Sequence, residues 1–224
     1  MGEDKKQQYS FWYRNSLSLV LVLCFILAFS GQTYTGWIEH NSDLEKLNAP
    51  PISLHEYLST GHFVEVTFEN WESEFLQMFM YVMLTIFLRQ QGSSESKSLE
   101  EPEEVDREPL PHQDAPWPVK KGGWWLRLYK SSLTIAFIIL FIVSFWLHAY
   151  GSLRDYNEEQ RLRNEPEKTM REYILTSRLW FESFQNWQSE FVAVTAIVVL
   201  SIYLRQKGSP ESKPVDAPIL ETGN

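Results

Sequence analysis

The sequence predicts an all-α membrane protein with four transmembrane helices, arranged as two tandem helical hairpins in a parallel repeat. Two long windows of the chain, residues 15–38 and 131–153, contain no charged side chain, although 22% of its 224 residues are charged. Two shorter charge-free windows, residues 75–88 and 191–204, follow them. The second half of the chain also repeats the first. These observations together predict the fold class.

The first long window predicts a span over about residues 16–38. About 20 apolar residues in a helix cross the hydrocarbon core of a bilayer, because each residue adds about 1.5 Å. Lys5, Lys6 and Arg14 precede this window, so a cleaved signal peptide is the competing interpretation. Its counterpart in the second half is internal and cannot be a signal peptide. We therefore expect the first window to be a retained span.

The repeat has one constant offset. Tyr57–Lys97 aligns without a gap with Tyr173–Lys213, and 19 of these 41 positions are identical. Each unit contributes an even number of spans, so both units have the same orientation in the membrane. The polar loops contain Ser53-x-x-Glu56 and Thr169-x-x-Glu172, which fit the capping box. We expect each box to begin a short amphipathic helix outside the membrane.

These assignments divide the chain into five parts. Residues 92–122 hold five Pro and eight acidic residues between positions 93 and 118, a composition that predicts disorder. Thirteen Lys and Arg lie on the side of the two termini, in residues 1–14, 89–130 and 205–224, against seven in the loops 39–74 and 154–190, so the positive-inside rule places both termini in the cytoplasm. The parts are the cytoplasmic N-terminus 1–14, the first two-span repeat 15–91 (spans about 16–38 and 70–89), the linker 92–122, the second repeat 123–207 (spans about 131–152 and 186–205) and the flexible cytoplasmic tail 208–224.

The composition excludes several classes of protein. The net charge is −9 and no basic block is present, so nucleic acid is not an expected partner. A single cysteine, Cys24, cannot form an internal disulfide. The five histidines have no metal-binding spacing, and no Ser-His-Asp, Cys-His or paired-acid pattern is present. We therefore expect no enzyme, no cofactor and no metal.

The most informative motif is N-W-[EQ]-S-E-F, which precedes both short windows. Helical spacing places polar residues on one stripe of the span over residues 70–89. Placing a carboxylate, such as that of Glu74 or Glu190, at the boundary of the apolar core costs free energy, which suggests that these residues have a function there. The competing interpretation is polar packing that fixes the register of the helices. The candidate polar site consists of Glu74, Glu190, Asn70, Asn186, Gln77 and Tyr81.

Other residues of the repeat have plainer predicted roles. Trp71 and Trp187 are expected to anchor the outer interface, and Arg89 and Arg205 the cytoplasmic one. Gly92 and Gly208 are expected as C′ caps of the second and fourth spans. The acidic residues Glu65, Glu69 and Glu72 share one helical face, which is usually solvated, and His148 is expected to be packed or interfacial.

The motif F-E-N-W-E-S-E-F-L-Q-M, followed by Y-V-M-L-T-I-F-L-R-Q-Q-G-S-S-E-S-K, resembles an uncharacterised bacterial family of multi-pass membrane proteins, a domain of unknown function. The segments N-S-L-S-L-V-L, G-Q-T-Y-T-G-W and Y-N-E-E-Q-R are also similar to it. The resemblance covers nearly the whole chain outside the linker and tail. It implies a bacterial membrane protein of four spans and no activity.

We therefore predict a non-enzymatic integral membrane accessory or scaffold subunit of the bacterial plasma membrane. Its expected surroundings are the lipid bilayer and either a membrane-protein partner or further copies of the same chain. The alternative is a small proton or cation transporter or channel that uses Glu74 and Glu190.

Overall fold

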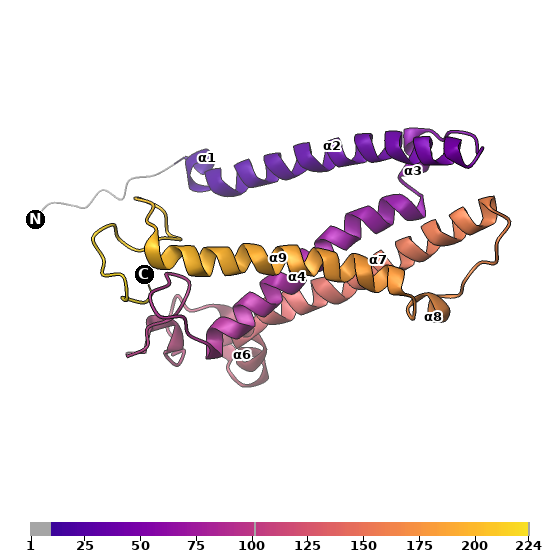
Figure 1. The fold of residues 1–224 in the computed structure, drawn as a ribbon. Helices are drawn as coiled ribbons and strands as arrows, with labels where there is room; N and C mark the ends of the chain where they lie inside the picture. The colour runs from indigo at the N-terminus through magenta and orange to yellow at the C-terminus, as the bar shows by residue number, and fades with distance from the viewer. Residues whose placement is uncertain (1–9, 101, 224) are drawn as a thin grey trace, which may run out of the picture.

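The computed structural model describes residues 10–100 and 102–223, and its regular elements are all helices (Figure 1). These residues contain no β-strand, so the all-α prediction is confirmed for them. Of the predicted cytoplasmic N-terminus, residues 1–9 lie outside the described part. The elements are α1 (Phe11–Arg14), α2 (Ser16–Lys46), α3 (Leu54–Tyr57), α4 (Gly61–Phe87), η1 (Glu104–Asp106), α5 (Trp117–Lys121), α6 (Gly123–Lys130), α7 (Ser132–Leu162), α8 (Met170–Tyr173) and α9 (Ser177–Tyr203).

Four long helices carry the fold. Helices α2 and α7 have 31 residues each, and α4 and α9 have 27 each. Each bound of the three helices α7, α8 and α9 lies 116 positions after the corresponding bound of α2, α3 and α4. No Pro interrupts these stretches, so the helices extend well past the charge-free windows. We name the end that carries α3 and α8 the hairpin end, and the opposite end the terminal end (Figure 1).

Both predicted capping boxes are confirmed at the hairpin end. The Ser53 hydroxyl accepts a hydrogen bond from the Glu56 backbone N–H at 3.3 Å, and the Glu56 carboxylate accepts from the Ser53 N–H at 2.7 Å. Thr169 and Glu172 make the same pair of bonds at 3.4 and 2.8 Å. The helices that these boxes begin, α3 and α8, are single turns, so the boxes bend the chain between the long helices.

The C-terminal ends of α4 and α9 are capped by arginine, and the predicted glycine caps are wrong. Helix α4 ends at Phe87, five positions before Gly92, which lies in the following turn at φ +85°. Instead, Arg89 Nη1 donates to the backbone oxygens of Thr85, Ile86 and Leu88. Arg205 and Gly208 repeat this arrangement after α9. The guanidinium thus satisfies carbonyl groups that a helix end leaves without partners.

Two helices of the described residues, α2 and α7, have the length and mean hydropathy that a membrane span requires. We predicted four such helices. Helices α4 and α9 are long enough, but polar residues in their hairpin-end halves lower their mean hydropathy. Among these polar residues are Glu69, Glu72 and Glu74 in α4, and Glu182 and Glu190 in α9.

The tightest packing joins α4 and α7 at a glycine crossing. A Cβ atom placed on Gly61 would lie 2.4 Å from the Asp155 backbone nitrogen, and one on Gly151 would lie 2.4 Å from the Glu65 backbone nitrogen. The two backbones can approach this closely only because glycine lacks Cβ. Helix α9 packs along α4, whereas α2 stands apart over most of its length (Figure 1).

The linker and the tail form turns at the terminal end. Lys213 is buried, and its Nζ donates to the backbone oxygens of Pro218, Ile219 and Glu221. The Gly223 N–H donates to the Ser93 backbone oxygen, which joins the tail to the start of the linker. We predicted both segments to be disordered or flexible; their described residues have defined turns, η1 and α5, and their mobility stays a prediction.

Candidate functional site

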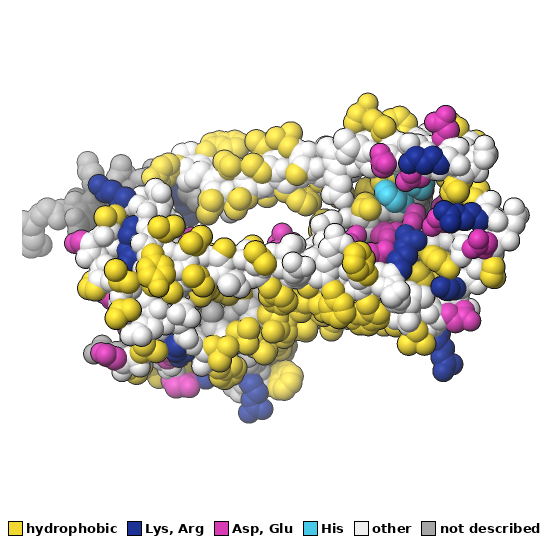
Figure 2. Space-filling view, viewed as in Figure 1, with side chains coloured by type: hydrophobic (Ala, Val, Ile, Leu, Met, Phe, Trp, Pro, Cys, Tyr) yellow, Lys and Arg dark blue, Asp and Glu magenta, His cyan; other side chains and the backbone are white. Residues whose placement is uncertain are grey.

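The hairpin-end half of α4 presents acidic side chains to the interior of the bundle. Glu65 is 6% exposed and Glu72 is fully buried, so the predicted solvated face is wrong. The spacing of Glu65, Glu69 and Glu72 identified one helical face correctly, but that face packs against α7 and α9. Figure 2 shows charged side chains at both ends of the molecule, the visible histidines at the hairpin end, and hydrophobic side chains over much of the surface between the ends.

Glu72 is held by donors from both neighbouring helices. His148 Nδ1 of α7 lies 2.6 Å from one carboxylate oxygen, and Trp187 Nε1 of α9 donates to the other at 2.8 Å. His148 is fully buried, as expected for a packed residue, and its Nε2 lies 3.5 Å from a Glu182 oxygen. A buried carboxylate needs such partners because burial removes its hydration.

The buried acidic side chains of α4 and the polar side chains of α7, α8 and α9 that contact them, directly or through one another, form what we call the acidic cluster. Ser152 lies at its centre. Its Oγ is 2.7 Å from the Tyr173 hydroxyl, 3.1 Å from Glu65 Oε1 and 3.0 Å from Glu182 Oε2. A serine hydroxyl carries one proton, so it donates to only one of the two carboxyl groups at a time. The other carboxyl group completes the network when it carries a proton itself.

Arg178 is the main cation of the cluster. It donates to Glu182 at 3.0 Å and to Asp155 at 3.1 Å, and its guanidinium lies 3.5 Å from Glu159 and 3.6 Å from Glu65. Several carboxylates therefore share one guanidinium. Such an arrangement favours proton uptake by the most deeply buried of these acids.

That acid is Glu65. Burial and, after it, the charges of Asp155 and Glu182 raise its pKa to about 8, against the opposing effects of Arg178 and Ser152. Burial also acts to raise the pKa of Glu182, but hydrogen bonds from His148, Arg178 and Ser152 lower it overall. The two carboxyl groups that meet Ser152 therefore differ in protonation at neutral pH, and Glu65 is the protonated one.

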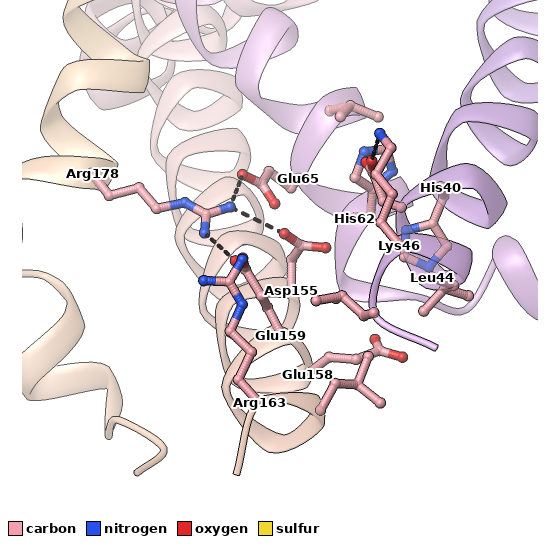
Figure 3. Close-up of a pocket in the computed structure, with 14 residues that line it drawn as sticks. His40, Leu44, Lys46, His62, Glu65, Asp155, Glu158, Glu159, Arg163 and Arg178 are labelled. Carbon is pink, nitrogen blue, oxygen red and sulfur yellow. Dashed lines mark hydrogen bonds and ion pairs between the residues drawn. The ribbon is translucent and has the colours of Figure 1, made fainter. Parts of the chain in front are cut away.

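A pocket of about 450 Å³ opens beside Glu65 and Arg178 (Figure 3). Its walls come from the ends of four helices: His40 on α2, His62 on α4, Asp155 on α7 and Arg178 on α9. Burial lowers the pKa of His62, so its imidazole is neutral at physiological pH. Among the described residues, no group of three or more His, Cys, Asp or Glu has an arrangement that holds a metal ion.

The predicted polar site is not assembled as one site. Asn186 alone joins the cluster, because its amide donates to a carboxylate oxygen of Glu69. Asn70 donates to the Val66 backbone oxygen of its own helix, and Glu74 is exposed. Gln77 donates to the backbone oxygen of Glu190 at 3.3 Å.

Two other predicted residues have different surroundings. Tyr81 donates to the Glu95 carboxylate near the terminal end. Of the two tryptophans expected as interface anchors, Trp71 packs against Phe25 and Phe29, whereas Trp187 belongs to the cluster through Glu72.

Sequence reasoning missed six members of the cluster: Ser152, Asp155, Glu159, Tyr173, Arg178 and Glu182. A signal was available: Ser152 lies four positions after His148, and Glu182 four positions before Asn186, so each pair shares a helical face. The spacing does not show that both faces pack against α4, because that contact depends on the tertiary structure.

The model of one protein family, described as a domain of unknown function (DUF6766), matches residues 8–224. No curated protein and no solved structure matches the chain.

Proposed function

Because the chain belongs to the DUF6766 family, a domain of unknown function, we propose its role from its own geometry: a non-enzymatic membrane accessory protein that binds a partner along α2. The proposal includes four spans, with α4 and α9 crossing the bilayer beside α2 and α7. It also places the hairpin end outside the cytoplasm and the terminal end inside, in the plasma membrane of a bacterium.

The surfaces of α4 and α9 support four spans. A helix of 27 residues is about 40 Å long, enough to cross the roughly 30 Å hydrocarbon core. The terminal-end halves of both helices expose apolar side chains, among them Ile86 and Phe87 on α4 and Val199 and Leu200 on α9. All four long helices run between the same two ends of the molecule (Figure 1). A bilayer that receives α2 and α7 therefore meets α4 and α9 as well.

One observation carries the partner proposal: the most apolar 18-residue stretch of α2 has no buried residue. Its contacts with α4 begin at Phe25 and Phe29, which pack against Trp71, and Gln32 donates to the Val66 backbone oxygen at 3.1 Å. Figure 2 shows an opening between α2 and α9. A helix held away from its own bundle offers both sides to other transmembrane helices.

The experiment is site-specific photocrosslinking in native membranes. A photoreactive phenylalanine replaces Leu23 or Leu27 of α2, and matched controls replace Ile139 and Val143 of α7, which are similarly exposed. We expect a discrete crosslinked protein from the α2 positions and lipid adducts alone from α7. A band at the size of two chains would identify the partner as a second copy. Lipid adducts alone at all four positions would contradict the proposal.

A second candidate is a proton or cation transporter, which the acidic cluster favours. Five carboxyl groups surround Arg178 and His148, and further polar groups on α4, Gln77 and Tyr81, continue toward the terminal end. Buried ionisable groups in membrane proteins commonly mark ion or proton pathways. This candidate moves the essential carboxylates from Glu74 and Glu190 to the cluster.

The two pairs of carboxylates can be tested against each other in liposomes. We expect Glu65→Gln with Glu72→Gln to abolish a pH- or cation-dependent flux, while Glu74→Gln with Glu190→Gln retains it. The opposite result would show that the pathway uses Glu74 on α4 and Glu190 on α9. Absence of flux in the wild-type protein would remove this candidate and leave the accessory role.

A further inference from the structure

The pocket at the hairpin end has the size and position of a ligand site. Its volume of about 450 Å³ lies within the range of about 300–1,000 Å³ that is usual for small-molecule pockets. It is formed where the ends of α2, α4, α7 and α9 converge, so its ligand would contact both halves of the chain (Figure 3). Part of its wall is apolar and consists of Leu44, Leu47, Val66 and Leu162.

The charge of the lining favours a cation. Five acidic and three basic side chains line the pocket, and with Glu65 protonated four acidic side chains still exceed the three basic ones. Each basic side chain is already engaged: Lys46 pairs with Asp43, Arg163 pairs with Glu159, and Arg178 bridges several carboxylates. The acidic side chains are Asp43, Glu65, Asp155, Glu158 and Glu159.

Two buried polar atoms of the lining point to hydrogen-bond donors on this cation. Glu65 and His40 are 6% and 5% exposed, and neither Glu65 Oε2 nor His40 Nε2 has a hydrogen-bond partner among the described residues. Both atoms can accept a hydrogen bond, the imidazole nitrogen in its neutral form. Buried polar atoms in proteins are nearly always satisfied, so these two require a donor.

N–H groups of an amine are the simplest donors for these atoms. The lining contains no Trp, Tyr or Phe, which excludes the aromatic cage that recognises quaternary ammonium ions. The lining also lacks a cluster suited to a metal ion. A primary ammonium has a positive charge and three N–H donors, which match an acidic lining and two acceptors without partners.

We propose that this pocket binds a compound with a primary ammonium group, whose N–H donors are matched by the acceptors Glu65 Oε2 and His40 Nε2 and whose charge is attracted by Asp155 and Glu158. Such a group belongs to soluble amines and also to the headgroup of phosphatidylethanolamine. In the proposed topology the pocket lies outside the cytoplasm, where both can reach it.

The soluble source is tested by calorimetry on the full-length protein in phosphatidylcholine nanodiscs, with putrescine as the probe. Tetramethylammonium is the matched control ligand, because it has the charge and no N–H donor. We expect putrescine to bind and tetramethylammonium to neither bind nor compete. Equal binding of the two ions would overturn the proposal, because it would show charge attraction alone.

The lipid source is tested by native mass spectrometry of protein extracted from membranes that contain phosphatidylethanolamine. Retained phosphatidylethanolamine that is displaced by putrescine would assign the site to the lipid. Binding of putrescine without retained lipid would assign it to a soluble amine. If neither ligand binds, the proposal is wrong.

Variants assign the binding to the pocket. We expect Glu65→Gln and His40→Phe each to weaken putrescine or lipid binding about tenfold or more, because each removes one acceptor. Glu74→Gln, an exposed acid on the same helix, should leave binding unchanged. Unaltered binding in both pocket variants, with wild-type circular dichroism, would overturn the proposal. His40→Phe keeps a ring of similar size and serves if Glu65→Gln fails to fold.

Discussion

Helices α2 and α7 have equal lengths and corresponding positions in the two halves, yet their surroundings differ. Helix α7 crosses α4 closely at Gly61 and Gly151, whereas α2 contacts α4 only sparsely, through residues such as Phe25, Phe29 and Gln32. The residues that correspond to these glycines are Ser177 on α9 and Thr35 on α2. An α2–α9 crossing as close as that of α4 and α7 is therefore blocked by two Cβ atoms. A few small residues decide which helices come together.

Tyr57 and Tyr173, which occupy corresponding positions in the two halves, also differ in the groups that they contact. Tyr173 meets the Ser152 hydroxyl at 2.7 Å, inside the acidic cluster. Tyr57 lies against Gly36, where no hydroxyl is available, and its own hydroxyl meets His62 Nδ1 at 3.1 Å. One half thus supplies the glutamates of α4, and the other half supplies the serine, histidine and arginine that hold them. The cluster exists only because the halves have become different.

The largest test of this difference compares His148 with its counterpart Gln32. His148→Leu leaves Glu72 fully buried with Trp187 as its remaining side-chain donor, so we expect a loss of about 3–5 kcal/mol in the free energy of unfolding. Gln32→Leu removes one hydrogen bond to a backbone oxygen and should cost about 1 kcal/mol. Steric trapping in bicelles measures both. Equal losses would mean that the cluster contributes no special stability.

The glycine crossing gives the next largest effect. Gly151→Ala places a Cβ atom 2.4 Å from backbone, so α4 and α7 must separate, and we expect a cost of about 2–3 kcal/mol. Gly31→Ala on α2 meets nothing within 4 Å and should stabilise its helix by about 0.5–1 kcal/mol. The same measurement applies, and crosslinking between cysteines placed on α4 and α7 reports their separation. Tolerance of both substitutions would contradict the close crossing.

Much of the fold could be predicted from the sequence, because it depends on local patterns. The charge-free windows predicted the long helices, and the capping boxes predicted the starts of α3 and α8. The cluster could not be predicted, because the spacing of Glu65, Glu69 and Glu72 marks a face without identifying the helix that covers it. Ser152 lies 87 positions from Glu65 and meets it only through the glycine crossing. The ends of α4 at Phe87 and of α9 at Tyr203 were not predicted, because arginine side chains cap them in place of the expected glycines.

A pH test separates Glu65 from the other acids. Burial and the charges of Asp155 on α7 and Glu182 on α9, which face it, together raise its pKa to about 8, while Arg178 opposes them. The folded protein then holds a proton that the unfolded chain releases near its ordinary pKa. Glu65 therefore stabilises the fold fully at low pH, and this contribution falls by up to about 1.4 kcal/mol per pH unit between about pH 5 and 8. The free energy of unfolding of Glu65→Gln should lack this decline.

The control for this test is Glu74→Gln, which changes an exposed acid of the same helix. Its unfolding free energy should follow the wild-type pH dependence. A decline that survives in Glu65→Gln would assign the buried proton to a different group.

The smallest effect comes from a feature that both halves share. The Ser53 and Thr169 hydroxyls accept hydrogen bonds of 3.3 and 3.4 Å in matching capping boxes. Ser53→Ala and Thr169→Ala should each cost about 1 kcal/mol, because each leaves backbone donors of a short helix without their side-chain partner. Equal losses would show that the halves still fold alike where their residues agree. A larger loss for Thr169→Ala would show that α8 also positions Tyr173 against Ser152, so that the cluster depends on the turn beside it.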